Sequence, residues 1–186
     1  MTTFKFKKKM EDIEEPALLD VGWYPVTVSK EPTVRPNEKL REAVPGENPS
    51  EKDLQAACKK DPRAGFTFFA DVIVLSSEDE IAGRRLTIMM PFPSDADQER
   101  RDRDGMLVYD AKMQRIAELS KACGNEAEGD EFPVNMGQEV QVYVKKRRKR
   151  NREELENVID IFAGFKAIGD EVEGLEGLEL GDEDLV

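Results

Sequence analysis

Three consecutive segments decide the fold of this chain: Gly137-Gln-Glu-Val-Gln-Val-Tyr-Val144, Lys145-Lys-Arg-Arg-Lys-Arg-Asn-Arg152 and Glu153-Glu-Leu-Glu-Asn-Val-Ile-Asp-Ile-Phe-Ala-Gly-Phe-Lys-Ala-Ile168. In the first segment, valines alternate with larger or polar residues, which is the period of a half-buried strand. From Val158 to Ile168 the chain is rich in β-branched and aromatic residues, so a second strand is expected there. The three segments together predict a β-hairpin.

The connection between these two predicted strands is strongly cationic. Seven of its eight residues carry a positive charge: Lys145, Lys146, Arg147, Arg148, Lys149, Arg150 and Arg152. The chain as a whole has a formal net charge of −12. A concentrated positive site on an acidic protein indicates a polyanionic ligand at that site. The alternative is a basic run that only solubilises the tip of the hairpin or serves as a localisation signal.

Composition limits the classes of protein to which the chain can belong. Its 186 residues are enough for one domain with appendages. There is no apolar run of the roughly 18 residues that a membrane span needs, and no apolar signal region, so we expect no membrane partner and a cytoplasmic location. The chain has two cysteines and no histidine. This excludes His-dependent catalysis and the usual zinc sites, and no phosphate-binding glycine motif is present, so we expect no cofactor, no metal and no enzymatic activity.

Three further strands and one helix are expected upstream. The strands are predicted at Gly22–Lys30, Phe66–Leu75 and Gly83–Pro91, and the helix at Met106–Cys123, where apolar residues recur at helical spacing. In the second of these strands Phe66 and Phe68 belong to the apolar face and are assigned to the core.

Between the first two strands lies a long proline-punctuated stretch, residues 31–64, which carries scattered cations. Within it, Glu51–Lys60 is predicted as a short helix capped by Ser50 or Asn48. A connection of this length inside a domain is usually functional or disordered.

The ends of the chain differ from its centre. Residues 1–19 form a basic arm followed by acidic residues, residues 20–168 form the domain, and residues 169–186 hold eight acids and no cation. That last composition is typical of a disordered segment.

The predicted order is strand, long loop, strand, strand, helix, strand, strand. It matches the OB-fold, a mainly β, five-stranded Greek-key barrel with a helix between strands 3 and 4. In that fold oligonucleotides bind to the face of strands 2 and 3 and to the loops joining strands 1–2 and 4–5. Here those two loops are the cation-bearing stretch 31–64 and the basic run 145–152.

On these features the chain resembles phage-encoded single-stranded-DNA-binding proteins of the OB-fold class. The resemblance rests on Gly22-Trp-Tyr-Pro-Val-Thr-Val28, Gly83-Arg-Arg-Leu86, the helix end at Ala111–Gly124, Gly137-Gln-Glu-Val-Gln-Val142 and the tail Gly181-Asp-Glu-Asp-Leu-Val186. It implies sequence-nonspecific coating of single-stranded DNA during phage replication, recombination and repair in the host cytoplasm. It also implies an acidic tail (Asp182, Glu183, Asp184, Leu185, Val186) that contacts replication or recombination enzymes such as a polymerase, helicase or primase. Self-association is a further expectation.

Sequence-tolerant binding of single strands needs cations for phosphates and aromatic faces for bases. The cation candidates outside the basic run are Arg84, Arg85, Lys59, Lys60 and Arg63. The aromatic candidates are the rings expected off the apolar face, namely Trp23, Phe69, Tyr143 and Phe162. The acidic tail could occupy the same cationic groove when DNA is absent.

Two other functions remain open from the sequence. One is a protein-interaction or assembly module whose basic hairpin docks an acidic partner. The other is a metal-dependent nuclease that uses Asp71, Asp110, Glu139 or Asp160 as magnesium ligands. RNA also remains open as the ligand, because stacking grooves accept both nucleic acids.

Overall fold

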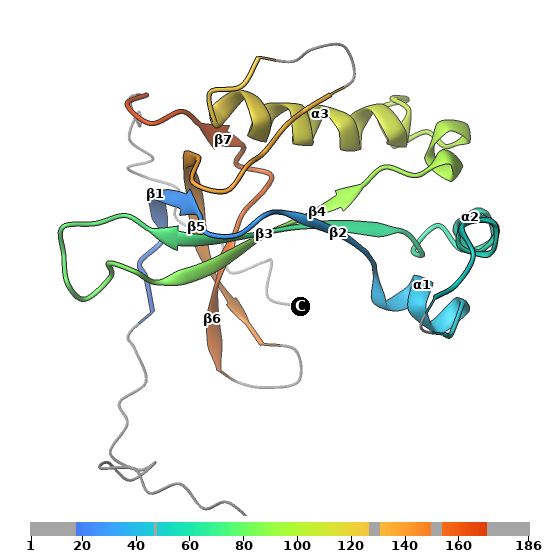
Figure 1. Cartoon of the computed structure of the whole chain (residues 1–186), viewed down its shortest axis with the longest axis horizontal. Helices are drawn as coiled ribbons and strands as arrows, with labels where there is room; N and C mark the ends of the chain where they lie inside the picture. The colour runs from blue at the N-terminus through green and yellow to red at the C-terminus, as the bar shows by residue number, and fades with distance from the viewer. Residues whose placement is uncertain (1–17, 47, 127–130, 150–153, 171–186) are drawn as a thin grey trace, which may run out of the picture.

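An antiparallel sheet of seven strands organises the computed structural model of the chain, which describes residues 18–46, 48–126, 131–149 and 154–170 (Figure 1). The strands are β1 (Gly22–Val28), β2 (Thr33–Pro36), β3 (Phe66–Val74), β4 (Arg85–Phe92), β5 (Glu139–Arg148), β6 (Leu155–Ile159) and β7 (Phe165–Lys166). The helices are α1 (Glu38–Ala43), α2 (Glu51–Lys60) and α3 (Val108–Ala122), with a 3₁₀ helix at Asp95–Glu99. The fold is therefore mainly β, as the sequence predicts.

The sheet runs in the order β2-β3-β1-β5-β6, with β4 on the other edge of β3 and the short β7 beside β5. All of these pairings are antiparallel. β4 and β6 approach each other across the open side of the sheet without forming a ladder. In Figure 1 the β5–β6 hairpin points away from α3, and α1 and α2 lie together at the end of the sheet where β3 begins.

β2 continues β1 along the same edge of β3. Val28 pairs with Val72, whereas Thr33 pairs with Phe69, so the chain between the two strands carries two residues more than a regular ladder would hold. The extra residues form a bulge that contains Pro32, which cannot donate a ladder hydrogen bond. β2 is not among the predicted strands, because the sequence places this segment in the long loop 31–64.

The core follows the alternation of the strands. Val26, Val72, Ile88, Val140 and Val142 are each fully buried, and every one lies at an inward position of its strand. The helix α3 covers this layer with Ile116, Leu119 and Ala122, which helical spacing places on one face of the helix. The predicted core assignment is confirmed for Phe68, while Phe66 packs against a second, smaller core.

That second core joins α1 and α2 to the 3₁₀ helix through Leu40, Cys58 and Ala96. The helix α2 has the bounds predicted from the sequence, and the Ser50 side chain caps it by accepting from the Asp53 N–H. Both cysteines of the chain are free. No helix in the described part of the chain is both long enough and apolar enough to cross a bilayer.

Asp97 fixes the 3₁₀ helix to α3. Its carboxylate accepts from the Ser94 N–H at 2.8 Å and from Lys112 Nζ at 2.8 Å, and the residue is only 2% exposed. Burial pushes the pKa of Asp97 upward, but the Lys112 ammonium and the Ser94 donors outweigh burial and leave the pKa lowered. The Asp97–Lys112 ion pair lies inside the domain, so we assign it a structural role.

The structure corrects the prediction for residues 158–168. The chain leaves β6 after Ile159, turns at Asp160–Gly164 and returns only as the two-residue β7. The turn requires Gly164, whose φ of 82° lies in the left-handed region. A single strand over Val158–Ile168 is therefore wrong. The basic arm and the acidic tail lie largely or wholly outside the described residues.

Candidate nucleic-acid interface

The outer face of β3 and β4 carries side chains that the core does not use. Across the ladder Phe69 lies opposite Met89, Asp71 opposite Thr87, and Ile73 opposite Arg85. These are the odd-numbered positions of both strands, so they point away from the buried Ala70, Val72 and Ile88. Met89 is 54% exposed. An exposed apolar side chain next to an aromatic ring gives this face a contact surface for planar apolar groups.

Three adjoining hollows of about 290, 340 and 480 Å³ follow this face. The first two share Asp71 and Lys30, and all three share Thr87. The largest lies in the open seam between β4 and β6. We call this surface the β3–β4 trough and define it by Lys30, Arg35, Phe69, Asp71, Arg85, Thr87, Met89, Lys145, Arg147 and Phe162.

Two arginines of the trough, Arg85 and Arg35, lie on different strands. Arg85 is exposed on β4 and borders two of the hollows, and it pairs with no acid among the described residues. Arg35 on β2 holds its guanidinium over the Phe69 ring, 5.7 Å from the centroid. Both are therefore available to an anion that enters the trough.

Asp71 lies at the middle of the trough. Its carboxylate accepts from Thr87 Oγ1 at 3.0 Å and from Lys30 Nζ at 3.3 Å. These hydrogen bonds, from Thr87 first and from Lys30 second, lower the pKa of Asp71, so it is ionised at neutral pH.

The hairpin cations are not all in the connecting tip. Lys145, Lys146, Arg147 and Arg148 lie within β5, so the prediction that the whole basic run joins the two strands is wrong. A strand extends as far as Arg148 because each of these residues pairs with β6, the last being Arg148 with Leu155. Arg150 and Arg152 lie outside the described residues.

Acidic side chains compensate most of the described hairpin cations. The pairs are Lys145–Asp160 at 2.9 Å, Lys146–Asp20 at 3.0 Å, Arg147–Glu156 at 2.8 Å and Lys149–Glu154 at 2.8 Å. Arg148 forms no ion pair with a described acid. Because these bridges are partly solvent-exposed, each contributes roughly 1 kcal/mol or less, and a polyanion can displace the acidic partner at low cost.

Phe162 closes the trough at the seam between β4 and β6. It is 75% exposed, the highest value among the large apolar side chains of the described residues. The Arg115 guanidinium stands 4.6 Å from the ring centroid and donates through Nη1 to the Ile161 carbonyl at 2.9 Å. A ring this exposed has surface left for stacking besides the part that Arg115 covers.

Trp23 and Tyr143 form a separate aromatic group. They lie opposite each other on β1 and β5 with their centroids 5.6 Å apart, and Lys166 on β7 places Nζ 4.8 Å from the centroid of the Trp23 ring. Neither ring lines the hollows of the trough. The structure therefore separates these two predicted site residues from Phe69 and Phe162.

The remaining predicted cations lie elsewhere. Arg84 turns back to donate to the Glu80 carbonyl. Lys59 and Lys60 lie at the end of α2, with Lys59 paired to Glu99 at 3.7 Å. Arg63 is paired with Asp61, whose pKa its guanidinium lowers. Only Arg85 of this group borders the trough.

Sequence reasoning missed Lys30, Arg35 and Met89 as site residues. Arg35 lies in β2, and Lys30 lies shortly before it. The prolines of this segment are untypical of a strand, so the sequence does not predict β2. A signal was present for Met89, because the alternation of Leu86, Ile88 and Met90 places Met89 outward, as observed.

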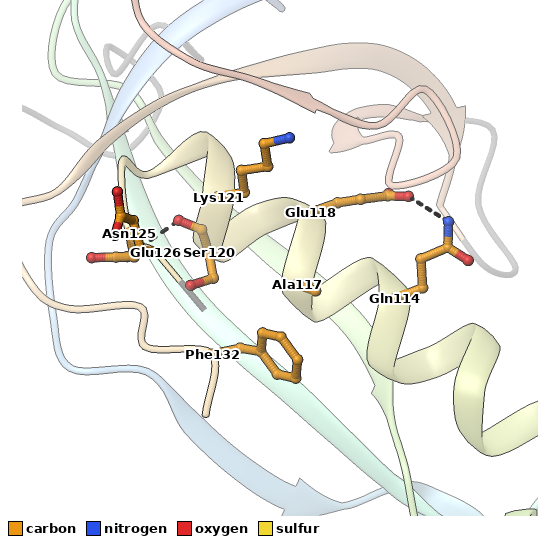
Figure 2. A pocket seen from close by; sticks show the side chains of 8 residues that line it. All are labelled: Gln114, Ala117, Glu118, Ser120, Lys121, Asn125, Glu126 and Phe132. Carbon is orange, nitrogen blue, oxygen red and sulfur yellow. Dashed lines mark hydrogen bonds between the residues drawn. The ribbon is translucent and has the colours of Figure 1, made fainter. Parts of the chain in front are cut away.

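A separate hollow of about 400 Å³ lies on α3, away from the trough, and is mainly apolar (Figure 2). Figure 2 shows Phe132 beneath the helix, and Gln114 bonded to Glu118 along its surface. Among the described residues that line it, Lys121 is the one cation, and Glu118 and Glu126 are acidic. The negative charge of this lining does not favour a polyanion.

The carboxylates considered for a nuclease do not gather. Asp71 and Asp160 line different hollows of the trough, and each is already bonded, Asp71 to Thr87 and Asp160 to Lys145. Among the described residues no three Asp, Glu, Cys or His side chains lie close enough together to hold a metal ion.

Comparison with known proteins adds no family to this geometry, because neither a protein-family model nor a curated protein matches the chain.

Proposed function

We propose that this chain binds single-stranded DNA without sequence specificity, along the β3–β4 trough. The observation that carries the proposal is the trough itself: half-buried Phe69 and exposed Met89 and Phe162 line it together with Arg35, Arg85 and the hairpin cations Lys145 and Arg147. Aromatic faces provide sequence-tolerant stacking worth about 1–3 kcal/mol per base, and the cations neutralise phosphates.

The strand pairing supports an OB-fold as the framework. If β1, β3, β4, β5 and β6 are taken as its five strands, the ladders β1–β3, β3–β4, β1–β5 and β5–β6 follow the order of that barrel. The helix α3 falls between the third and fourth of these strands. The trough then lies on strands two and three, the surface that binds oligonucleotides in this fold.

A single strand would follow the trough from β2 towards the seam between β4 and β6. Phe69 and Phe162 would each accept a base, while Arg35 and Arg85 would bind the adjoining phosphates. Lys145 and Arg147 would add two contacts once the strand displaces Asp160 and Glu156 from their partly exposed ion pairs.

We further propose that the chain coats single strands in phage replication, recombination and repair. The acidic tail at Asp182–Val186 would recruit replication or recombination enzymes. These two proposals rest on the resemblance and on the charge of the tail, which lies outside the described residues.

A binding titration of the full chain tests the function. Fluorescence anisotropy would follow a labelled dT 20-mer and a 20-base-pair duplex at 50 and 200 mM salt. Three cations that form no ion pair with a described acid (Arg35, Arg85, Arg148) give a slope of log affinity on log salt of about −2, and two more from Lys145 and Arg147 give about −3.5. The expected result is tighter binding of the single strand and a loss of about 15- to 130-fold across this salt range. Equal binding of the duplex, or salt-independent binding, would overturn the proposal.

A further inference from the structure

Asp71 is an unusual residue for a trough that binds a polyanion. Its side chain is 46% exposed, and it lines two of the three hollows. Thr87 and Lys30 hold its two carboxylate oxygens in fixed positions. An ionised carboxylate repels a phosphate at close range, so the strand cannot place a phosphate there.

The neighbouring ring indicates which part of a nucleotide meets Asp71. Phe69 lies two residues earlier on β3 and points to the same face, at a separation of about 7 Å along the strand. A base stacked on Phe69 reaches several ångströms beyond the ring, so one of its edges comes towards the carboxylate. The Arg35 guanidinium, which lies over the same ring 5.7 Å from its centroid, is then near enough to bind the phosphate of that nucleotide.

Carboxylate oxygens only accept hydrogen bonds, which makes them selective among base edges. Cytosine presents an exocyclic amino group, and a carboxylate accepts from it. Guanine presents two adjacent donors on its Watson–Crick edge. Thymine presents one N–H between two carbonyl oxygens, and those oxygens repel a carboxylate.

We propose that Asp71 reads the hydrogen-bonding edge of the base stacked on Phe69 and favours guanine and cytosine over thymine. The inference rests on the proposed single-strand binding. It makes one nucleotide-binding position of the trough base-selective. Thr87 and Lys30 are positioning residues for the carboxylate.

The test compares oligonucleotides that differ only in base edges. Anisotropy titrations of the full chain would use a dT 20-mer, a dC 20-mer at pH 7.5, and a thymine 20-mer with an isolated guanine at every fourth position. A fourth oligonucleotide replaces each guanine by hypoxanthine, which lacks the exocyclic amino group. We expect the guanine and dC oligonucleotides to bind at least about fivefold more tightly than dT, with hypoxanthine between guanine and thymine.

The variant Asp71→Asn keeps the size of the side chain but adds a donor that thymine carbonyls accept. We expect its preference for dC over dT to fall to about one, with the affinity for dT preserved or raised. Asp79→Asn, which removes the same charge from the exposed β3–β4 turn, is the matched control and should keep the wild-type preference. Thermal unfolding verifies that both variants are folded.

Two results would overturn the inference while leaving the proposed function intact. One is equal affinity of the wild-type chain for all four oligonucleotides. The other is a base preference that Asp71→Asn leaves unchanged. If the chain binds none of the oligonucleotides in a salt-dependent way, the proposed function itself fails.

Discussion

Arg85 provides the sharpest test of where phosphates bind. It is an exposed cation at the start of β4, bordering two hollows, and it has no ion pair to a described acid. The substitution Arg85→Gln removes its charge and keeps a polar side chain of similar length. Since no acid loses a partner, the fold should be preserved.

The expected effect follows from counterion release. Each phosphate contact on a single strand contributes about 0.7 to the slope of log affinity on log salt. Arg85→Gln should therefore make the slope less steep by about 0.7 and weaken binding about fivefold at 0.1 M salt, with the difference vanishing near 1 M. Anisotropy titrations of a labelled dT 20-mer at five salt concentrations measure both quantities.

The control is Arg103→Gln, which removes the same charge from an exposed position in the connection to α3, outside the trough. We expect this variant to keep the wild-type slope. If both variants lower the slope equally, the positive charge of Arg85 acts only through the field of the whole protein, and the assignment of a phosphate to β4 is refuted.

Three further predictions follow from the same geometry. Phe69→Ala should weaken binding by about 1–3 kcal/mol, whereas Trp23→Phe should leave it within about twofold; equal losses in anisotropy titrations would move the path of the strand to β1 and β5. Asp160→Asn frees Lys145 from its ion pair and should tighten binding of a dT 20-mer, most clearly at 50 mM salt, and weaker binding would contradict the displacement of this acid. Asp97→Asn should lower the free energy of unfolding by about 3 kcal/mol at pH 7. Because the pKa of Asp97 is lowered by folding, this contribution is complete above the unfolded pKa near 4 and is lost as the pH falls through the lower folded value, so urea unfolding should show the gap between wild type and variant closing below about pH 4.

Local patterns predicted the regular part of the fold well. The alternation in β1, β3, β4 and β5 places valines and isoleucines inward, and burial of Val26, Val72, Ile88 and Val142 confirms it. Helical spacing gave α3, and a Ser50 cap before an acidic first turn gave α2 with its observed bounds. These features are determined by residues close together in the sequence, and local patterns therefore predict them.

The errors lie where distant contacts decide the structure. β2 forms because β3 offers an edge beyond the end of β1, and its prolines conceal that from the sequence. The strand expected at Val158–Ile168 breaks where Asp160 is drawn into an ion pair with Lys145 and into a hydrogen bond with the Phe162 N–H.

The candidate site shows the same division. The outward position of Phe69 on its strand and the charge of the hairpin were readable from the sequence. Neither revealed that acids just before β6, on β6 and in the following turn pair with several of the hairpin cations. The trough itself depends on how β2, β4 and β6 meet, which no single segment encodes.

Photocrosslinking tests the central claim most directly. A dT 20-mer containing 5-iodouracil would be irradiated in complex with the full chain, and the crosslinked peptides would be identified by mass spectrometry. The account predicts crosslinks to the peptides that carry Phe69, Met89 and Phe162, which compete with unlabelled single strand and disappear at high salt. Crosslinks confined to the peptides that carry Trp23, Tyr143 or α3 would contradict it.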